Sequence, residues 1–201
     1  MLKPSKYLRI EERSERKWEA WAEFINSMHG LVLNAGCGNG VTSYLVSEHN
    51  PAVTRIVSLD LQFVDRVHHG RVFLQMFPQG EFVQGDVQAL PFPNNTFDSL
   101  MCLDVLQNVK DVSKTFKEFV RVCKQGAVVW IRALVKSDCG PVRVGAIEKG
   151  SSGYPFRIWW LWEIDELTDL ARASGLINAK GTVMIDGYRN QNRLFRVNKN
   201  V

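Results

Sequence analysis

Hydrophobic and polar positions near the start of the chain follow the period of a helix. Apolar residues recur at this spacing, and glutamate and arginine fill most of the positions between them: Ile10, Trp18, Trp21, Ile25 and Met28. One apolar stripe with a charged opposite face is typical of an amphipathic surface helix. The pattern therefore predicts a helix over residues 9–29 that ends at His29-Gly30.

The next part of the chain alternates between short apolar runs and segments with helical spacing. The apolar runs predict strands at 31–35, 55–60, 81–86, 97–104 and 127–135. Helical spacing predicts helices at 41–49 and 112–123, and residues 64–72 read as helical or irregular. Strands that alternate with helices predict an α/β, doubly wound, Rossmann-like fold with a mainly parallel sheet and helices on both faces.

Residues 137–157 interrupt this alternation with several glycines and prolines. Long irregular stretches in compact domains are often lids or binding loops, so residues 137–160 are a candidate lid or acceptor loop. A helix over 165–174 follows, stopped by Gly175. Strand candidates at 180–185 and 193–197 bring the predicted sheet to seven strands. With no internal repeat or linker, the sequence predicts a single domain over 1–201.

Composition and charge narrow the class of protein. The chain has 201 residues with 45% hydrophobic content, which suits one domain with a sizeable core. Its apolar runs are far shorter than the roughly 20 residues that span a bilayer. The charged N-terminus has no apolar core of a secretory signal, so we expect a cytoplasmic protein without a membrane span. A net charge of +4 permits a nucleic-acid partner but does not indicate one.

The four cysteines have no spacing typical of a metal site. Cys37, Cys102, Cys123 and Cys139 form no C-x-x-C pair and have no histidine at ligand spacing. We therefore expect free, mostly buried thiols, with no metal cofactor.

A glycine-rich loop follows the first predicted strand. Gly36, Gly38 and Gly40 form G-x-G-x-G, whereas a dinucleotide fingerprint needs a third glycine at the position of Val41. No Lys-Ser/Thr pair follows, which excludes a phosphate-binding P-loop. The loop predicts either a ligand lying against bare backbone at a strand's carboxyl end or merely a tight turn.

Two aspartates end the next predicted strands. Asp60 could accept both hydrogen bonds of a ribose diol, or it could simply cap a turn. Asp86 could accept from an adenine amino group, with Val87 in apolar contact with the ring.

Four stretches in order resemble the class I S-adenosyl-L-methionine (SAM)-dependent methyltransferases. VLNAGCGNG resembles the family's V-L-D-x-G-C-G-x-G, and GDVQALPFPNNTFD resembles G-D-a-x-x-L-P-F-x-d-x-s-F-D. VLQNVKDVSKTFKEFVRVCKQGA and IDELTDLARASGL are similar to two later motifs of the family. The likeness spans about residues 30–197 and is nearest to the ubiquinone/menaquinone-type small-molecule methyltransferases. It implies SAM as the cofactor.

The resemblance assigns roles to individual residues. Gly36, Cys37 and Gly38 would line the methionine and ribose parts, and Asp60 with Leu61 would hold the ribose. Asp86 and Val87 would frame the adenine, and Cys102 and Leu103 would make main-chain contacts with the cofactor.

Asn34 departs from the family because it stands where an acidic residue is usual. An amide keeps an acceptor but loses a charge facing the cofactor's cationic end. This should weaken SAM binding by about 1–2 kcal/mol.

No catalytic base can be named from the sequence. Candidates near the carboxyl ends of the strands or in loops are Asp104, Asn108, Arg132, Asp138, His68, His69 and Tyr154. For each, a purely structural role is an equal or stronger interpretation.

The aromatic run FRIWWLW, residues 156–162, has two interpretations. Phe156, Ile158, Trp160 and Trp162 alternate along it, either to fill the core or to form an aromatic wall for an acceptor. Trp18 and Trp21 would close that wall, and residues 1–25 and 137–160 would build the acceptor pocket.

Three hypotheses follow. The first is a SAM-dependent methyltransferase acting on a small organic acceptor. The second is a methyltransferase acting on tRNA or another macromolecule. The third is a non-catalytic SAM-binding or degenerate partner protein, motivated by Asn34. The sequence does not indicate the oligomeric state.

Overall fold

One seven-stranded sheet organises the chain. The computed structural model describes residues 22–38, 40–61, 80–134, 145, 147–149, 155–183 and 190–199. The strands of the sheet run in the order β3-β2-β1-β4-β5-β9-β8. Their bounds are β1 Gly30–Ala35, β2 Val53–Asp60, β3 Glu81–Gln84, β4 Phe97–Leu103, β5 Cys123–Leu134, β8 Leu176–Val183 and β9 Asn190–Val197.

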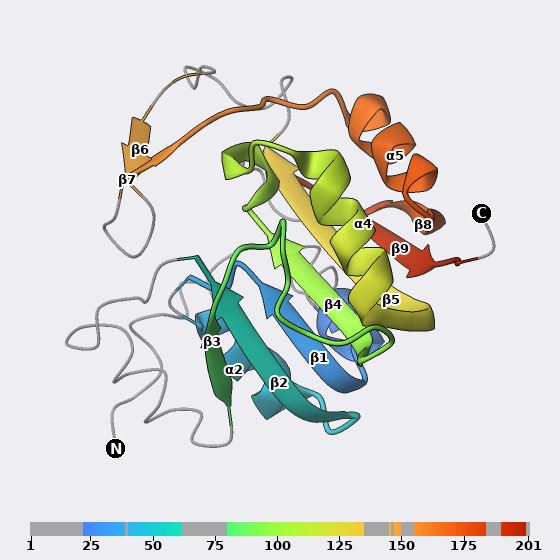
Figure 1. Ribbon diagram of the computed structural model, residues 1–201. Coiled ribbons are helices and arrows are strands. Elements are labelled where there is room, and N and C mark those ends of the chain that lie inside the picture. The colour runs from blue at the N-terminus through green and yellow to red at the C-terminus, as the bar shows by residue number, and fades with distance from the viewer. Residues whose placement is uncertain are drawn as a thin grey trace.

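The sheet is mainly parallel. β1 pairs in parallel with both β2 and β4, β2 with β3, and β4 with β5. β9 is antiparallel to its neighbours β5 and β8. The strand order reverses between β1 and β4, and at such a point an α/β sheet opens a crevice at its carboxyl edge. The predicted fold class is confirmed (Figure 1).

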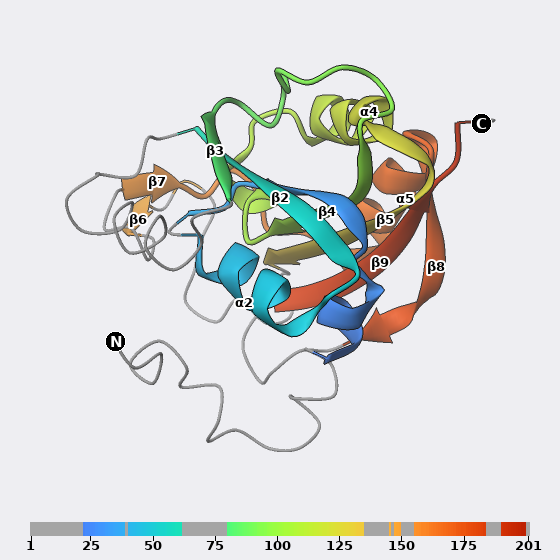
Figure 2. The same cartoon turned by 90° about the horizontal axis from the view of Figure 1, so that it is seen from below.

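Helices cover both faces of the sheet. α4 (Val112–Val122) and α5 (Ile164–Ala173) lie side by side on one face, and α2 (Val41–His49) lies on the other (Figures 1 and 2). Phe116 and Phe119 of α4 belong to the larger apolar cluster. A second cluster joins Phe24, from helical residues 22–27, to Trp130 of β5. Each sheet face therefore has its own core.

The helix ends follow local chemistry. Asp111 caps α4 by accepting a hydrogen bond from the Lys114 backbone N–H at 2.9 Å. A capping box between Glu163 and Glu166 begins α5. Beyond the end of α5, Gly175 has a φ of 95°, in line with the predicted glycine stop.

Several predicted boundaries were wrong; for example, β9 begins at Asn190 rather than residue 193, and β2 at Val53 rather than residue 55. β5 begins at Cys123 rather than residue 127, because a register shift after Phe97 and a left-handed Gly126 (φ 76°) let the chain pair earlier. β8 begins at Leu176 rather than residue 180. β3 ends at Gln84 rather than residue 86, because Asp86 already belongs to a turn.

The predicted loop over 137–157 contains a small sheet. β6 (Ile147–Lys149) and β7 (Pro155–Arg157) pair as an antiparallel hairpin. Apart from Gly145, the rest of that loop lies outside the described residues, as do the predicted helical residues 9–21 and the stretch 64–72. In the part of the chain that the structure describes, no helix combines the length and hydropathy that a membrane crossing requires.

Candidate functional site

The carboxyl ends of the parallel strands bring the predicted site residues to one edge of the sheet. The glycine loop follows β1, Asp60 ends β2, Asp86 follows β3, and Leu103 ends β4. This is the edge at which open α/β sheets bind ligands. Residues that are far apart in the sequence therefore meet here, as the strand pattern predicts.

The glycine loop is held by the end of β2. The backbone N–H groups of Gly36 and Cys37 donate to the Leu59 carbonyl at 2.7 and 2.9 Å. The backbone N–H of Gly38 donates to Oδ2 of Asp60 at 2.8 Å. Asp60 therefore fixes the loop through one carboxylate oxygen, a role that the sequence did not predict.

Gly36 is required by a neighbour within the protein. It has a φ of 83°, and a Cβ added there would lie 2.2 Å from Cγ2 of Val105. Val105 belongs to the turn after β4, so this turn packs directly against the glycine loop. The close approach that the glycine permits is thus at least partly internal.

Asn34 lies inside a small polar cluster. Its side chain is 2% exposed, and its amide nitrogen donates to the Ser43 hydroxyl at 2.8 Å. The Ser43 and Ser58 hydroxyls share a further hydrogen bond of 2.8 Å. The cluster ties β1 to α2 and β2, which gives the asparagine a structural reason where the sequence indicated only a departure.

Asp86 is occupied by its own turn. Its Oδ1 accepts from the Gln88 backbone N–H at 2.8 Å, and its carboxylate also accepts from Nε2 of Gln88. Val87 is buried in the larger core, whereas Leu61 is 63% exposed. Val87, which was expected to contact the adenine ring, is therefore enclosed by the protein, whereas Leu61, expected beside the ribose, presents an open surface.

The loop after β3 is anchored by α4. Glu118 accepts from the Leu90 backbone N–H at 2.7 Å and from Arg121 Nε at 2.7 Å. Arg121 in turn donates to the carbonyls of Leu90 and Phe92 at 2.9 and 2.8 Å. The hydrogen bond from Arg121 lowers the pKa of the Glu118 carboxyl below its ordinary value. The E-x-x-R part of the third motif therefore shapes this loop.

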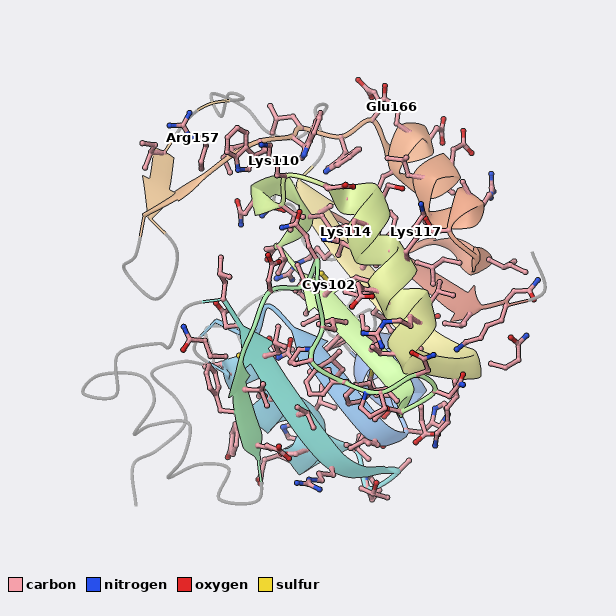
Figure 3. All side chains as sticks on the ribbon, in the orientation of Figure 1. Cys102, Lys110, Lys114, Lys117, Arg157 and Glu166 are labelled. Atoms are coloured by element: carbon pink, nitrogen blue, oxygen red, sulfur yellow. The ribbon has the colours of Figure 1, made fainter. Side chains whose placement is uncertain are left out.

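The cysteines of the site are buried thiols. Burial is the main cause that raises the pKa of both Cys37 and Cys102, and the charges of Asp60 and Asp104 respectively add to it. Figure 3 shows Cys102 within the fold, on β4. The prediction of free, mostly buried cysteines is confirmed for the three described ones, Cys37, Cys102 and Cys123. Leu103 packs against the second core.

Two candidate bases form an ion pair. The Asp104 carboxylate accepts from Nε of Arg132 at 2.9 Å and from Nη2 of the same guanidinium. The Asp104 backbone N–H also donates to the Arg132 carbonyl at 2.9 Å. Asp104 has a φ of 60°, which is unusual for a residue other than glycine and often marks a functional turn.

The turn after β4 also contains Gln107, which the sequence interpretation missed. Nε2 of Gln107 and Nδ2 of Asn108 donate to the Asp104 carbonyl at 2.8 and 3.3 Å. Among the described residues, the side-chain carbonyl oxygens of both amides are buried without a hydrogen-bond partner. Adjacent amides just past a strand end were the available signal.

The aromatic segment packs against the same turn. The Trp159 backbone N–H donates to the Gln107 carbonyl at 2.7 Å, and Trp160 Nε1 donates to the Val109 carbonyl at 2.8 Å. Ile158 and Trp162 are buried, whereas Trp159 and Trp160 are 40% and 43% exposed. The predicted alternation is wrong at Trp160, because residues 158–161 form no strand.

Other predicted site residues lie outside the described residues: His68, His69, Asp138, Tyr154, Trp18 and Trp21. A groove on the α5 side is lined by residues 159–162 together with Glu166 and Asp169. Its lining residues belong to α5 and to the segment that precedes it.

Comparisons with known proteins agree with this geometry. Residues 33–131 match the family described as a methyltransferase domain. A phosphatidylethanolamine N-methyltransferase of Cereibacter sphaeroides is 29% identical over 73% of this chain and 70% of that protein. A demethylmenaquinone methyltransferase of Symbiobacterium thermophilum is 27% identical over 56% of this chain. The matched region covers about half (48%) of the length of that relative.

Solved structures share the fold. A SAM-dependent methyltransferase from Mesorhizobium loti has a TM-score of 0.68 over 91% of this chain and 98% of that chain, at 14% identity.

The fold and motifs define a SAM-binding α/β protein of the class I type. Residues 33–131 of the chain belong to the class I SAM-dependent methyltransferase family. Its cofactor is accordingly S-adenosyl-L-methionine.

Proposed function

We propose that this protein transfers a methyl group from SAM to a small organic acceptor. The observation that carries the proposal is the convergence of the glycine loop and Asp60 beside the turn after β4. Gly38 donates to Asp60 at 2.8 Å, and Val105 of that turn packs on Gly36.

The proposed cofactor contacts come from four strand ends: Asn34, Gly36, Cys37, Gly38, Asp60, Leu61, Asp86, Val87, Cys102 and Leu103. A fit is supported by the half-buried Asp60 carboxylate beside main-chain glycine, which suits a ribose diol. The exposed Leu61 next to it suits an apolar ring face. For Asn34 and Val87, which are almost completely buried, we propose an indirect role in shaping the pocket.

Bound SAM would supply a methyl group that its sulfonium already activates. The chain's own residues then need to hold the acceptor in line and keep water out, and orientation alone can supply much of the rate. The Asp104 carboxylate is paired with Arg132, so we propose that this pair fixes the turn rather than removing a proton.

A small acceptor is favoured over a macromolecule by the charge distribution around the site. Lys110, Lys114 and Lys117 are exposed along α4 and its approach (Figure 3). However, Lys114 is one turn from Glu118, and Glu166 lies on the neighbouring helix. Mixed charge of this kind does not make a basic surface for nucleic acid. The relatives whose names refer to ethanolamine lipid and menaquinone precursors support the same choice.

Calorimetric titration with SAM and S-adenosylhomocysteine tests the proposal. We expect micromolar dissociation constants for both ligands, a range that corresponds to about 8 kcal/mol of binding free energy. Mass spectrometry of small molecules that copurify, followed by incubation with labelled SAM, would then identify the methylated product. Absence of binding at millimolar SAM would contradict the proposal.

A further inference from the structure

The turn after β4 orients two side-chain amides through one carbonyl. The Asp104 carbonyl oxygen accepts from Nε2 of Gln107 at 2.8 Å and from Nδ2 of Asn108 at 3.3 Å. The Asp104 carboxylate accepts from the guanidinium group of Arg132, and the Asp104 backbone N–H donates to the Arg132 carbonyl. The carbonyl that orients both amides therefore has a fixed position.

Both amides leave an acceptor without a partner. Oε1 of Gln107 and Oδ1 of Asn108 are buried and make no hydrogen bond within the described part of the chain. The Gln107 side chain is 6% exposed, so bulk water does not readily reach it. A buried carbonyl without a hydrogen-bond partner destabilises the fold, so each such atom in a native protein calls for an explanation.

The orientation of each amide is set by its network. Exchanging the nitrogen and oxygen of either amide would place a carbonyl oxygen against the Asp104 carbonyl, where two acceptors repel each other. Gln107 and Asn108 must therefore present their oxygens on the side away from Asp104.

The turn that carries these oxygens adjoins the proposed cofactor loop. Val105, in the same turn, packs on Gly36 of the glycine loop. On the other side, the backbone N–H groups of Trp159 and Trp160 donate to the Gln107 carbonyl, and both indoles are exposed. The turn thus lies between the proposed cofactor loop and an aromatic surface. The remaining orphaned buried atom in the described chain, Nε1 of Trp162, belongs to the same aromatic segment.

We propose that Gln107 Oε1 and Asn108 Oδ1 bind hydrogen-bond donors of the acceptor, which would be a hydroxyl or amino compound rather than a carboxylate. This inference rests on the proposed function. Two neutral carbonyl oxygens attract O–H and N–H groups and repel an anionic oxygen. Because an amide is not a base, both residues act by binding and orienting the acceptor.

Four fragments with the same ring test this specificity in protein saturated with S-adenosylhomocysteine. Benzyl alcohol and benzylamine carry donors, whereas benzyl methyl ether and benzoate carry none. Dissociation constants and the side-chain amide signals of Gln107 and Asn108 would be measured by nuclear magnetic resonance. We expect the donor fragments to bind about threefold to tenfold more tightly, and to shift those amide signals, because each hydrogen bond to a neutral group contributes that range.

Two variants and a matched control locate the effect. Gln107→Met and Asn108→Leu keep the volume and remove the acceptor, so each should reduce the preference for donors while S-adenosylhomocysteine affinity stays within about twofold. Gln125→Met removes an exposed amide that lies on β5 and not in the turn after β4. It should change neither the preference for donor fragments nor the affinity for S-adenosylhomocysteine. If Gln107→Met does not unfold cooperatively and is therefore misfolded, the fragment preference of Asn108→Leu and the amide signals of the wild type test the inference.

Three results would overturn the inference: equal binding of all four fragments, no binding of any at their solubility limit, or a donor preference that survives in Asn108→Leu. Loss of stability together with cofactor affinity, without a change in fragment preference, would make the amides purely structural. Each of these leaves the proposed function standing if wild type binds SAM. Failure of wild type to bind SAM would instead remove the proposed function.

Discussion

The ends of β1, β2 and β3 differ from the turn after β4 in how their polar groups are satisfied. At the first three strand ends, the side chains of the candidate site make hydrogen bonds to other groups of the protein. Asn34 donates to Ser43, Asp60 accepts from Gly38, and Asp86 accepts from Gln88. These ends are held in one arrangement by hydrogen bonds of 2.8 Å.

The turn after β4 is less complete. Asp104 adopts a left-handed backbone conformation, and the amide oxygens of Gln107 and Asn108 have no partner among the described residues. The neighbouring Trp159 and Trp160 expose large apolar surfaces. A site that is already ordered loses less entropy when it binds, whereas unpaired acceptors gain most from a ligand that supplies donors. Under the proposals made above, the first three strand ends form a preformed cofactor half, and the turn after β4 belongs to an acceptor half that the substrate would complete.

Gly36 joins the two halves, and changing it should have the largest effect. Gly36→Ala should cost about 2–5 kcal/mol of unfolding free energy, because left-handed strain adds to a clash with Val105. Gly126→Ala is a matched control: its φ of 76° is similar, but nothing lies within 4 Å of the added Cβ. It should cost only about 1–2 kcal/mol in urea denaturation.

Adding Val105→Ala to the Gly36 variant should recover part of its loss, since the closest contact is removed while a tight Cβ contact of 3.2 Å and the backbone strain stay. Equal costs at Gly36 and Gly126 would show that the contact between the halves is unimportant.

Asp60 should be the main polar anchor of the cofactor half. Asp60→Ala should raise the dissociation constant for SAM by about tenfold or more, as expected for hydrogen bonds to a charged group. Asp60→Asn keeps an acceptor for the Gly38 N–H, so its unfolding free energy should change less than that of the alanine variant. A calorimetric titration that is the same for all three proteins would refute the ribose assignment.

The loop of the cofactor half should depend on Glu118 and on pH. The folded-state pKa of Glu118 is lowered, so its stabilisation is present above the ordinary carboxyl pKa of about 4.3 and is lost as the pH falls through the lower folded value. Glu118→Gln should cost about 1–3 kcal/mol at neutral pH, and the difference from wild type should shrink in acid.

Asp169→Asn serves as its control, because the Asp169–Arg172 pair is exposed and should contribute less than about 1 kcal/mol. A difference between Glu118→Gln and wild type that does not vary with pH would contradict the assigned role.

Asn34 should have the smallest effect on ligand affinity. Asn34→Asp should tighten SAM binding by up to about tenfold at low salt, because it restores a negative charge near the cofactor. The Ser43 hydroxyl can rotate to donate to the new carboxylate, but burial to 2% exposure favours uptake of a proton and costs stability. The hypothesis of a degenerate fold that has lost its cofactor instead requires that neither protein binds at millimolar SAM. Side-by-side titration separates these outcomes.

The sequence by itself determined the fold class and the sheet edge at which we propose the site. Alternating strand and helix periods required a parallel sheet, and parallel strands bring their carboxyl ends together. The glycine loop, Asp60 and Asp86 could therefore be predicted near one another from local patterns alone. The departure at Asn34 was also visible, although its hydrogen bonds to the hydroxyl cluster were not.

Only the tertiary structure decided which side chains contact or hydrogen-bond one another and which polar atoms keep no partner among the described residues. Asp104 and Arg132 are 28 positions apart, and the contact between Gly36 and Val105 crosses from β1 to the turn after β4. Trp160 is exposed although the alternation predicted otherwise, because its segment follows the β4 turn and not a strand ladder. Hydrophobic periodicity in the sequence predicts on which face of its own helix or strand a residue lies. The hydrogen-bond partners of a side chain depend on elements that the local pattern does not contain, and so the open oxygens of Gln107 and Asn108 emerge only in three dimensions.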